Sequence, residues 1–162
     1  MDPLSAIGLA GTILQFVDFS SNLIAGTYEV YKSAEGTTAE NADISAIVGD
    51  LYLLSDDLDF DLLGSTKHEK ALKILAGKCR ELSESLIVIV ERLKVSGKSS
   101  TWKCLRVKMA ALRKSQEIEY IERRLREYRS QILLRLTLML GYVRSLIRRA
   151  KLTSHLVINN PR

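Results

Sequence analysis

Apolar residues recur every three or four positions along most of this chain, which is the spacing of one face of an α-helix. The clearest run lies in the middle of the sequence and alternates these steps without a break: Leu72, Leu75, Cys79, Leu82, Leu86, Ile89 and Leu93. A shorter run precedes it: Ile44, Ile47, Leu51, Leu54 and Leu58. A longer run follows Ser115, the expected helix cap: Ile118, Ile121, Leu125, Tyr128, Ile132, Leu136, Met139, Val143 and Leu146. These runs predict three amphipathic helices.

Capping residues and glycines mark the expected helix boundaries. A first helix is expected over residues 3–33, with Asp2 as its cap, Pro3 in its first turn and Gly36 after its end. Two T-x-x-E capping boxes predict the starts of the next two helices: Thr37 with Glu40, and Thr66 with Glu69. A loop is expected over residues 96–100, where the sequence is SGKSS.

The predicted elements are all helical, because no stretch alternates apolar and polar residues as a half-buried strand does. A short helix is expected over residues 102–112, between the loop and the last long helix. Long helices joined by short loops favour an up-and-down arrangement. The expected fold is therefore an all-α, up-and-down four-helix bundle with a short additional helix before the last long helix. Residues 1–152 would form the bundle and residues 153–162 a C-terminal tail.

Composition is that of one soluble globular domain. The chain has 162 residues, of which 46% are hydrophobic and 27% charged, and this length can bury a sizeable core. The sequence contains two cysteines, Cys79 and Cys104, which is too few for a disulfide framework. An intracellular, reducing compartment is therefore favoured.

The opening segment is the most apolar part of the chain. No charge occurs from Leu4 to Val17, and Asp18 follows directly. A signal peptide is disfavoured because no basic residue precedes Lys32. A fixed transmembrane anchor is disfavoured because the uncharged run is shorter than the roughly 20 residues that a span requires. The favoured interpretation is a helix that is packed in the core at rest.

Two features of this helix leave a change of position open. Apolar residues are expected on every side of it, whereas a surface helix has a polar face: Leu4, Ile7, Leu9, Ile13, Leu14, Phe16 and Val17. Gly8 and Gly11 each weaken the helix by about 1 kcal/mol relative to alanine. A helix that is apolar all round and intrinsically weak need not stay where it packs.

Charge is divided unevenly along the chain. Residues 1–66 contain one base and eleven acids, whereas residues 67–162 contain 23 bases and eight acids. One interpretation is that complementary halves pack together, with the basic last helix against the acidic second helix. The other is that the basic half also faces an acidic partner. The candidate contacts to anionic lipid headgroups are Lys98, Lys103, Arg106, Lys108, Arg144, Arg148, Arg149 and Lys151.

Other chemistry finds little support in the sequence. Nucleic-acid binding is disfavoured because aromatic residues make up only 6% of the chain and no known binding motif is present. The SGKSS segment resembles the end of a phosphate-binding loop, but Arg92 stands where the first glycine belongs and a helix is expected before it. His68 and His155 have no cysteine or histidine at metal-ligand spacing. Acids 56–61 are interpreted as the acidic end of the second helix, because they lack the glycine and final glutamate of a calcium loop. We therefore predict no enzyme activity, no catalytic residue, no metal and no cofactor, and we interpret Trp102 as a packing residue.

Three segments in this order resemble the HeLo-like domain, the N-terminal domain of fungal STAND (NLR-like) receptors and of amyloid-controlled cell-death proteins. They are MDPLSAIGLAGTILQFVDF, TYEVYKSAEG and WKCLRVKMAALRKSQEIEYIERRLREYRSQILLRLTLML. The resemblance covers about residues 1–150. It also implies similarity to the HeLo domain of fungal toxins and to the four-helix bundle of the mixed-lineage kinase domain-like protein. One departure is Asp18, which interrupts the apolar stretch of the first helix.

The resemblance implies a function in programmed cell death, fungal immunity and heterokaryon incompatibility. Such domains are cytoplasmic at rest, oligomerise and then disrupt the plasma membrane through the first helix, which makes the apolar residues of the opening segment the candidate membrane-inserting set. Implied partners are anionic membrane lipids, a self-oligomer that includes a resting dimer, and a C-terminal nucleotide-binding or amyloid module. The chain is expected to be either an excised domain or a stand-alone relative. The alternative function is a non-lytic helical adaptor, which would not lose activity selectively on a mild change such as Leu9→Ser.

Overall fold

The computed structural model describes four stretches of the chain: residues 3–27, 44–59, 67–94 and 101–158. Side chains are described from Ser5 to Lys151 within these stretches. Five helices account for 92% of the described residues: α1 (Pro3–Ala25), α2 (Ile44–Asp56), α3 (Lys67–Leu93), α4 (Trp102–Leu112) and α5 (Gln116–Ile158). No β-strand occurs in those stretches, so the expected all-α class is confirmed.

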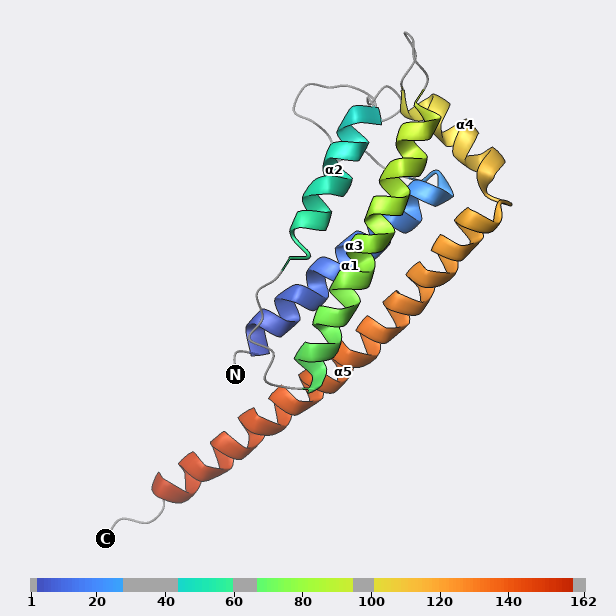
Figure 1. Cartoon of the computed structure of the whole chain (residues 1–162). Helices are drawn as coiled ribbons and strands as arrows, with labels where there is room; N and C mark the ends of the chain where they lie inside the picture. Colours follow the sequence, from blue (N-terminus) through green and yellow to red (C-terminus); the bar gives the residue numbers. More distant parts are fainter. Residues whose placement is uncertain (1–2, 28–43, 60–66, 95–100, 159–162) are drawn as a thin grey trace.

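The long helices run in alternating directions, as Figure 1 shows: α1 and α3 run toward the top of the view, and α2 and α5 run toward the bottom. α1 lies at the centre and packs against all the other helices, most extensively against α5 and α3. α2 packs against α3 and α1 rather than against α5. The expectation that the acidic second helix packs against the basic last helix is therefore wrong.

The core is formed by the apolar stripes that the sequence spacing predicted. All five positions of the stripe predicted for the second helix are buried, although α2 ends at Asp56 and Leu58 lies in the turn after it: Ile44, Ile47, Leu51, Leu54 and Leu58. The α3 stripe is buried from Leu72 to Ile89, and Leu93 at its end is half-buried. α2 packs against α3 and α1, and α3 packs most extensively against α1 and α2, so these neighbouring helices remove the two stripes from water.

The first helix ends at Ala25, eight residues before the expected end at residue 33, so the expected boundary is wrong. Gly26 has a positive φ of 74°, which L side chains rarely adopt. Its N–H donates to the Leu23 carbonyl at 3.3 Å, and the Thr27 N–H donates to the Asn22 carbonyl at 3.0 Å. This pair of bonds is the Schellman ending of a helix. The expected capping residues Thr37, Glu40 and Thr66 lie outside the described residues.

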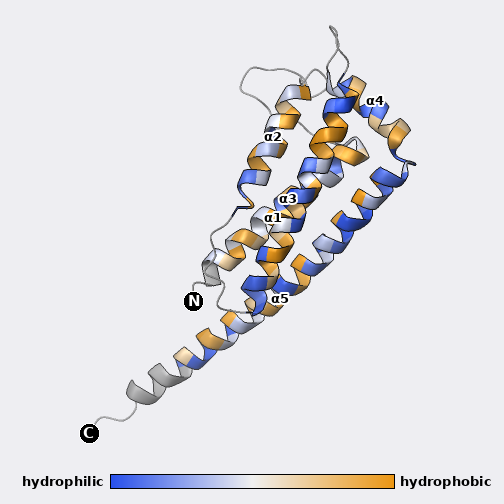
Figure 2. Ribbon diagram, in the orientation of Figure 1, coloured by the Kyte–Doolittle hydropathy of each residue, from blue (hydrophilic) through white to orange (hydrophobic). Residues whose placement is uncertain are grey.

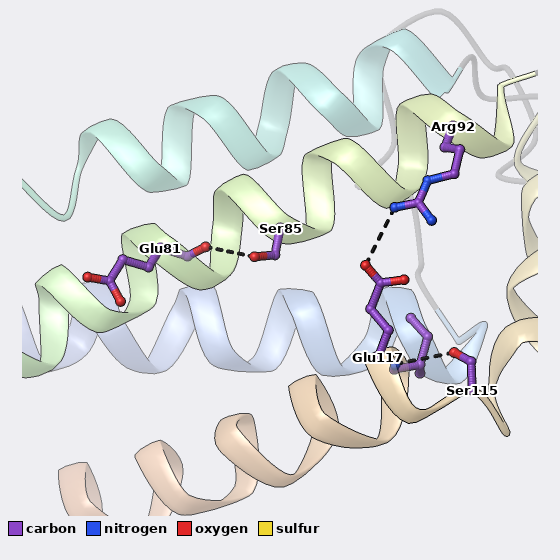
Figure 3. A network of polar contacts seen from close by, with 6 residues as sticks. Glu81, Ser85, Arg92, Ser115 and Glu117 are labelled. Atoms are coloured by element: carbon purple, nitrogen blue, oxygen red, sulfur yellow. Dashed lines mark hydrogen bonds and ion pairs between the residues drawn. The ribbon is translucent and has the colours of Figure 1, made fainter.

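The α4–α5 junction agrees with the sequence prediction. α4 spans Trp102–Leu112, as expected, and the buried Trp102 confirms the packing interpretation of this residue. The Ile118 N–H donates to the Ser115 hydroxyl at 3.4 Å, so Ser115 caps α5 (Figure 3). In the same view, the Arg92 guanidinium of α3 pairs with the Glu117 carboxylate of α5 at 3.5 Å. The junction therefore fixes the start of α5 beside the end of α3.

α5 is about 65 Å long, as expected from 1.5 Å per residue, and it extends past the other helices. Its predicted stripe is buried at Ile118, Ile121, Leu125, Tyr128, Ile132 and Met139. Leu136 and Val143 are half-buried, and Leu146 is 42% exposed, so the expected core role of Leu146 is wrong. The helix continues to Ile158, beyond residue 152 where a tail was expected. Residues 140–151, which follow the last buried side chain, are called the α5 arm below.

Candidate functional site

The candidate membrane-inserting residues lie in the protein core. Leu9, Ile13, Phe16 and Val17 are buried, Ile7 is half-buried against the same core, and Leu14 is half-buried. The Leu4 side chain lies outside the described residues. Because α1 is surrounded by the other helices, these residues can reach a membrane only if α1 leaves its place.

α1 nevertheless has one exposed face, which corrects the expectation that it is apolar on every side. Gly8, Gly11, Gln15 and Asn22 are exposed, and helical spacing places them along one line. Asp18, whose side chain is 43% exposed, lies on the same line and is the single charged residue of this face. Apart from Asp18, the face adds little to the cost of moving α1 into lipid.

Three residues make α1 less stable in its place than its apolar content suggests. A methyl group added at Gly8 or Gly11 would meet no heavy atom within 4 Å, so these glycines are not required by close packing. The hydroxyl oxygen of Ser20 is buried and has no hydrogen-bond partner. A buried polar group without a partner costs about 1–3 kcal/mol. α1 is thus well buried, but its two glycines and the Ser20 hydroxyl without a partner lower the stability of its packed state.

The single charge within the apolar stretch, Asp18, pairs with Arg129 of α5. The Asp18 carboxylate lies 3.2 Å from the Arg129 guanidinium, and both side chains are about half exposed. An ion pair of this exposure contributes about 0.2–1 kcal/mol. The pair joins the acidic and basic halves of the chain, and sequence spacing gave no signal for this partner.

The candidate lipid-contacting residues fall into two groups at opposite ends of the molecule. Lys103, Arg106 and Lys108 lie on α4 near the top of Figure 1, and the other described members lie on the α5 arm at the bottom: Arg144, Arg148, Arg149 and Lys151. Lys98 lies outside the described residues. Both groups can touch one flat surface only if the long axis of the molecule lies along it.

The α4 group also has roles within the fold. The Lys108 ammonium donates to the Leu93 carbonyl at 2.9 Å and thereby satisfies the C-terminal end of α3. The Arg106 stem covers Gly26, since a Cβ placed there would lie 3.0 Å from the Arg106 Cγ. Lys103 is exposed. Arg144 and Arg148 of the arm are exposed and lie beyond Met139, the last buried side chain of α5.

The apolar spacing in the sequence did not indicate that the arm exposes large apolar residues. Leu140, Tyr142 and Ile147 are each more than half exposed, as are Leu134 and Leu138 just before them. Figure 2 shows apolar and polar residues alternating along this projecting part of α5. The available signal was the absence of any acid after Glu127, which already set this part of the helix apart.

The described residues offer no obvious centre for other chemistry. Neither Cys79 nor Cys104 forms a disulfide, and burial raises the pKa of the Cys79 thiol to about 12, so that it stays protonated at neutral pH. In the described part of the chain, no three histidine, cysteine or acidic side chains are grouped to hold a metal ion. The SGKSS segment, where a loop was expected, lies outside the described residues, and the element before it in the chain is a helix, α3, as expected.

One helix among the described residues is long and apolar enough to cross a membrane by length and composition: Ser5–Ala25, within α1. A core helix of a soluble protein meets the same criteria, and 44% of this stretch is buried. Comparison of the chain with protein families, curated proteins and solved structures gives no match.

Proposed function

We propose that this protein is a HeLo-like, membrane-disrupting domain that stores α1 in a helical core and releases it into an anionic membrane after oligomerisation. α1, α2, α3 and α5 then form the up-and-down four-helix bundle, and α4 is the short additional helix. Their alternating directions and the central position of α1 support this proposal. The proposed protein is cytoplasmic at rest and acts at the plasma membrane without catalysis or a cofactor.

The observation that carries the proposal is that α1 suits two environments. As a core helix it buries Leu9, Ile13, Phe16 and Val17. As a membrane helix it offers Ser5–Ala25, which is 21 residues long and contains Asp18 as its single charge. The roughly 20 residues that cross a bilayer match this length. Asp18 is the single charge on its exposed face in the bundle, so moving α1 into lipid transfers one charge and otherwise uncharged surface.

Oligomerisation provides the proposed trigger. A single helix must carry Asp18 into lipid at the full cost of one charge, whereas packing contacts among several inserted copies offset this cost. A C-terminal nucleotide-binding or amyloid module would raise the local concentration of the domain and favour such assembly. A resting dimer would delay it. Self-association and anionic lipid are accordingly the partners that the proposal requires.

The test is dye release from vesicles with a variant that affects α1 only in lipid. Gln15 is exposed in the bundle, so Gln15→Glu leaves the core intact. In a bilayer the new charge costs about 2.5–3.5 kcal/mol, which lowers the insertion equilibrium by about a hundredfold. We expect wild type to release dye from vesicles that contain phosphatidylserine and Gln15→Glu to require a much higher protein concentration.

The matched control is Gln116→Glu, the same change at the exposed start of α5. It should release dye as wild type does, and circular dichroism should show both variants folded. Leu9→Ser is unsuitable as a mild change, because Leu9 is fully buried and its loss would destabilise the fold. Equal dye release by Gln15→Glu and wild type would reject insertion of α1.

A non-lytic adaptor is the second candidate function. Large apolar side chains are exposed on helices other than the arm: Tyr52, Leu53, Ile74 and Val88. Such side chains on α2 and α3 favour a surface that binds a partner helix. Complete absence of dye release from vesicles of every composition, with a folded and oligomeric protein, would favour the adaptor.

A further inference from the structure

The α5 arm continues the helix beyond the packed core. Met139 is the last buried residue of α5, and every described side chain from Leu140 to Lys151 is exposed or half-buried. Figures 1 and 2 show this segment projecting past the ends of the other helices. Among the described residues, none packs over its end. Apolar surface in such a position is unfavourable in water until a partner covers it.

The arm has two chemically distinct faces. Leu140, Val143 and Ile147 are separated by three and four positions, and Leu146 lies beside them, so they form one apolar face. Arg144, Arg148 and Lys151 follow the same spacing on another face: they are four and three positions apart. The apolar face continues the line of the buried α5 stripe. The arm is therefore an amphipathic helical segment whose apolar face extends beyond the helices that cover the rest of the stripe.

Charge indicates which partner covers this face. The arm contains four basic residues, and the sequence contains no aspartate or glutamate after Glu127. Two arms from separate copies would bring like charges together, whereas anionic headgroups would neutralise them. A helix with bases on one face and aliphatic residues on the other is typical of segments that lie in a membrane interface. Tyr142 is also exposed here, and tyrosine favours that interface.

We propose that the α5 arm is an anchor that lies in the plane of an anionic membrane while α1 is still in the core. Leu140, Val143, Leu146 and Ile147 enter the headgroup boundary, and the basic face contacts the headgroups. The inference rests on the proposed function for its lipid partner, but it does not require α1 to move. α1 begins at the end of the molecule from which the arm projects, so docking holds the start of α1 near the bilayer (Figure 1).

Vesicle flotation with the full chain tests the anchor directly. The vesicles are phosphatidylcholine alone, or phosphatidylcholine with an equimolar amount of phosphatidylserine. The test variant is Leu146→Ser with Ile147→Ser, and the matched control is Ile74→Ser with Val88→Ser, two exposed aliphatic residues on α3. A third variant, Arg144→Gln with Arg148→Gln, removes two charges. All substituted residues are exposed, and circular dichroism verifies the fold.

We expect wild type to float with the anionic vesicles and not with phosphatidylcholine alone. The arm variant should bind at least about tenfold more weakly because it loses aliphatic surface, and the α3 control should bind as wild type does. The arginine variant should lose about fivefold per charge. Wild-type binding by the arm variant, or no vesicle binding by wild type, would overturn the anchor. The anchor would also be overturned if wild type formed a dimer in solution and bound no lipid, and if the arm variant alone failed to form that dimer. A second copy of the chain would then cover the apolar face.

Failure of the anchor and failure of the proposed function give different results. Flotation that depends on the arm, without dye release, supports the anchor and rejects membrane disruption by α1. Dye release that is blocked by Gln15→Glu, together with normal flotation of the arm variant, supports α1 insertion and rejects the anchor.

Discussion

α1 and the α5 arm are both helical segments with many large apolar side chains, but the fold places those side chains in opposite environments. α1 packs against all four other helices and buries most of its large apolar side chains, whereas the arm lies past the last buried residue of α5. Their charges differ as well. α1 has one acid, Asp18, and no base, whereas the arm has four bases and no acid.

This difference in burial and charge suits the two segments to different membrane contacts: insertion across the bilayer and docking at its interface. A helix with a single charge can cross the bilayer interior, where each charge is costly. A helix with many bases on one face is better suited to the interface, where those bases meet headgroups. The same molecule therefore contains a helix suited to insertion, which is hidden, and a helix suited to docking, which is exposed.

The largest expected effect that separates the two regions is on stability. Phe16 is fully buried in α1, and Phe16→Ala should lower the free energy of unfolding by about 3–5 kcal/mol. Leu146→Ala in the arm should change it by less than about 0.5 kcal/mol, as is usual for surface substitutions. Urea denaturation followed by circular dichroism measures both. Similar losses for the two variants would show that the arm is part of the cooperative core.

The next effect concerns the charge in α1. Asp18→Asn removes a charge that costs about 2.5–3.5 kcal/mol in the centre of a bilayer. We expect dye release to begin at a protein concentration at least about tenfold lower than for wild type. Titration of protein into anionic vesicles measures this shift. A variant that needs more protein than wild type would mean that Asp18 is required in the inserted state.

Glycine substitutions compare helix stability in the two regions. Gly8→Ala and Gly11→Ala should each raise the free energy of unfolding by about 1 kcal/mol, because alanine favours the helix and meets no atom within 4 Å. Gly141→Ala in the arm also meets none, but it should leave global unfolding unchanged. Thermal denaturation of the three variants decides between these outcomes. If Gly141→Ala raised the free energy of unfolding as much as Gly11→Ala does, the arm would unfold together with the core, contrary to this prediction.

The smallest effect is expected for the ion pair between Asp18 of α1 and Arg129 in the packed part of α5. Arg129→Gln breaks the contact to Asp18 but leaves the acid charged. It should lower the free energy of unfolding by about 0.2–1 kcal/mol and should not reproduce the gain in dye release of Asp18→Asn. If the two variants release dye equally well, the ion pair and not the membrane cost of Asp18 controls α1.

Local sequence signals predicted much of the fold. The stripe of α3, the bounds of α4 and the Ser115 cap agree with the structure because each depends on residues close in sequence. The end of α1 was also a local signal: Gly26 is followed by the Schellman bonds, but the prediction extended the helix past it. The prediction used Gly36 as the stop signal, whereas the glycine with a positive φ at the end of the helix is Gly26.

Features that depend on tertiary packing were not predictable in this way. The apolar spacing of α5 continues unchanged from Ile132 to Leu146, and only the positions of other helices decide where burial stops. The pairing of Asp18 with Arg129 likewise joins distant parts of the chain. The candidate inserting residues were identified by their composition, whereas their burial against α3 and α5 required the structure.

The most direct test of the central claim is to follow α1 itself with an environment-sensitive nitrobenzoxadiazole label. Gly11→Cys places the label on the exposed face of α1, where an added Cβ meets no atom within 4 Å. Cys104→Ser removes the half-buried thiol. Cys79 remains in place, since burial raises its pKa to about 12 and leaves it a poor nucleophile for labelling at neutral pH.

The labelled protein is mixed with anionic vesicles that carry a quencher deep in the acyl chains, and dye release is recorded in the same sample. The proposal predicts that label emission shifts to the blue and is quenched as dye escapes. Dye escape while the label stays in water, unshifted and unquenched, would contradict insertion of α1.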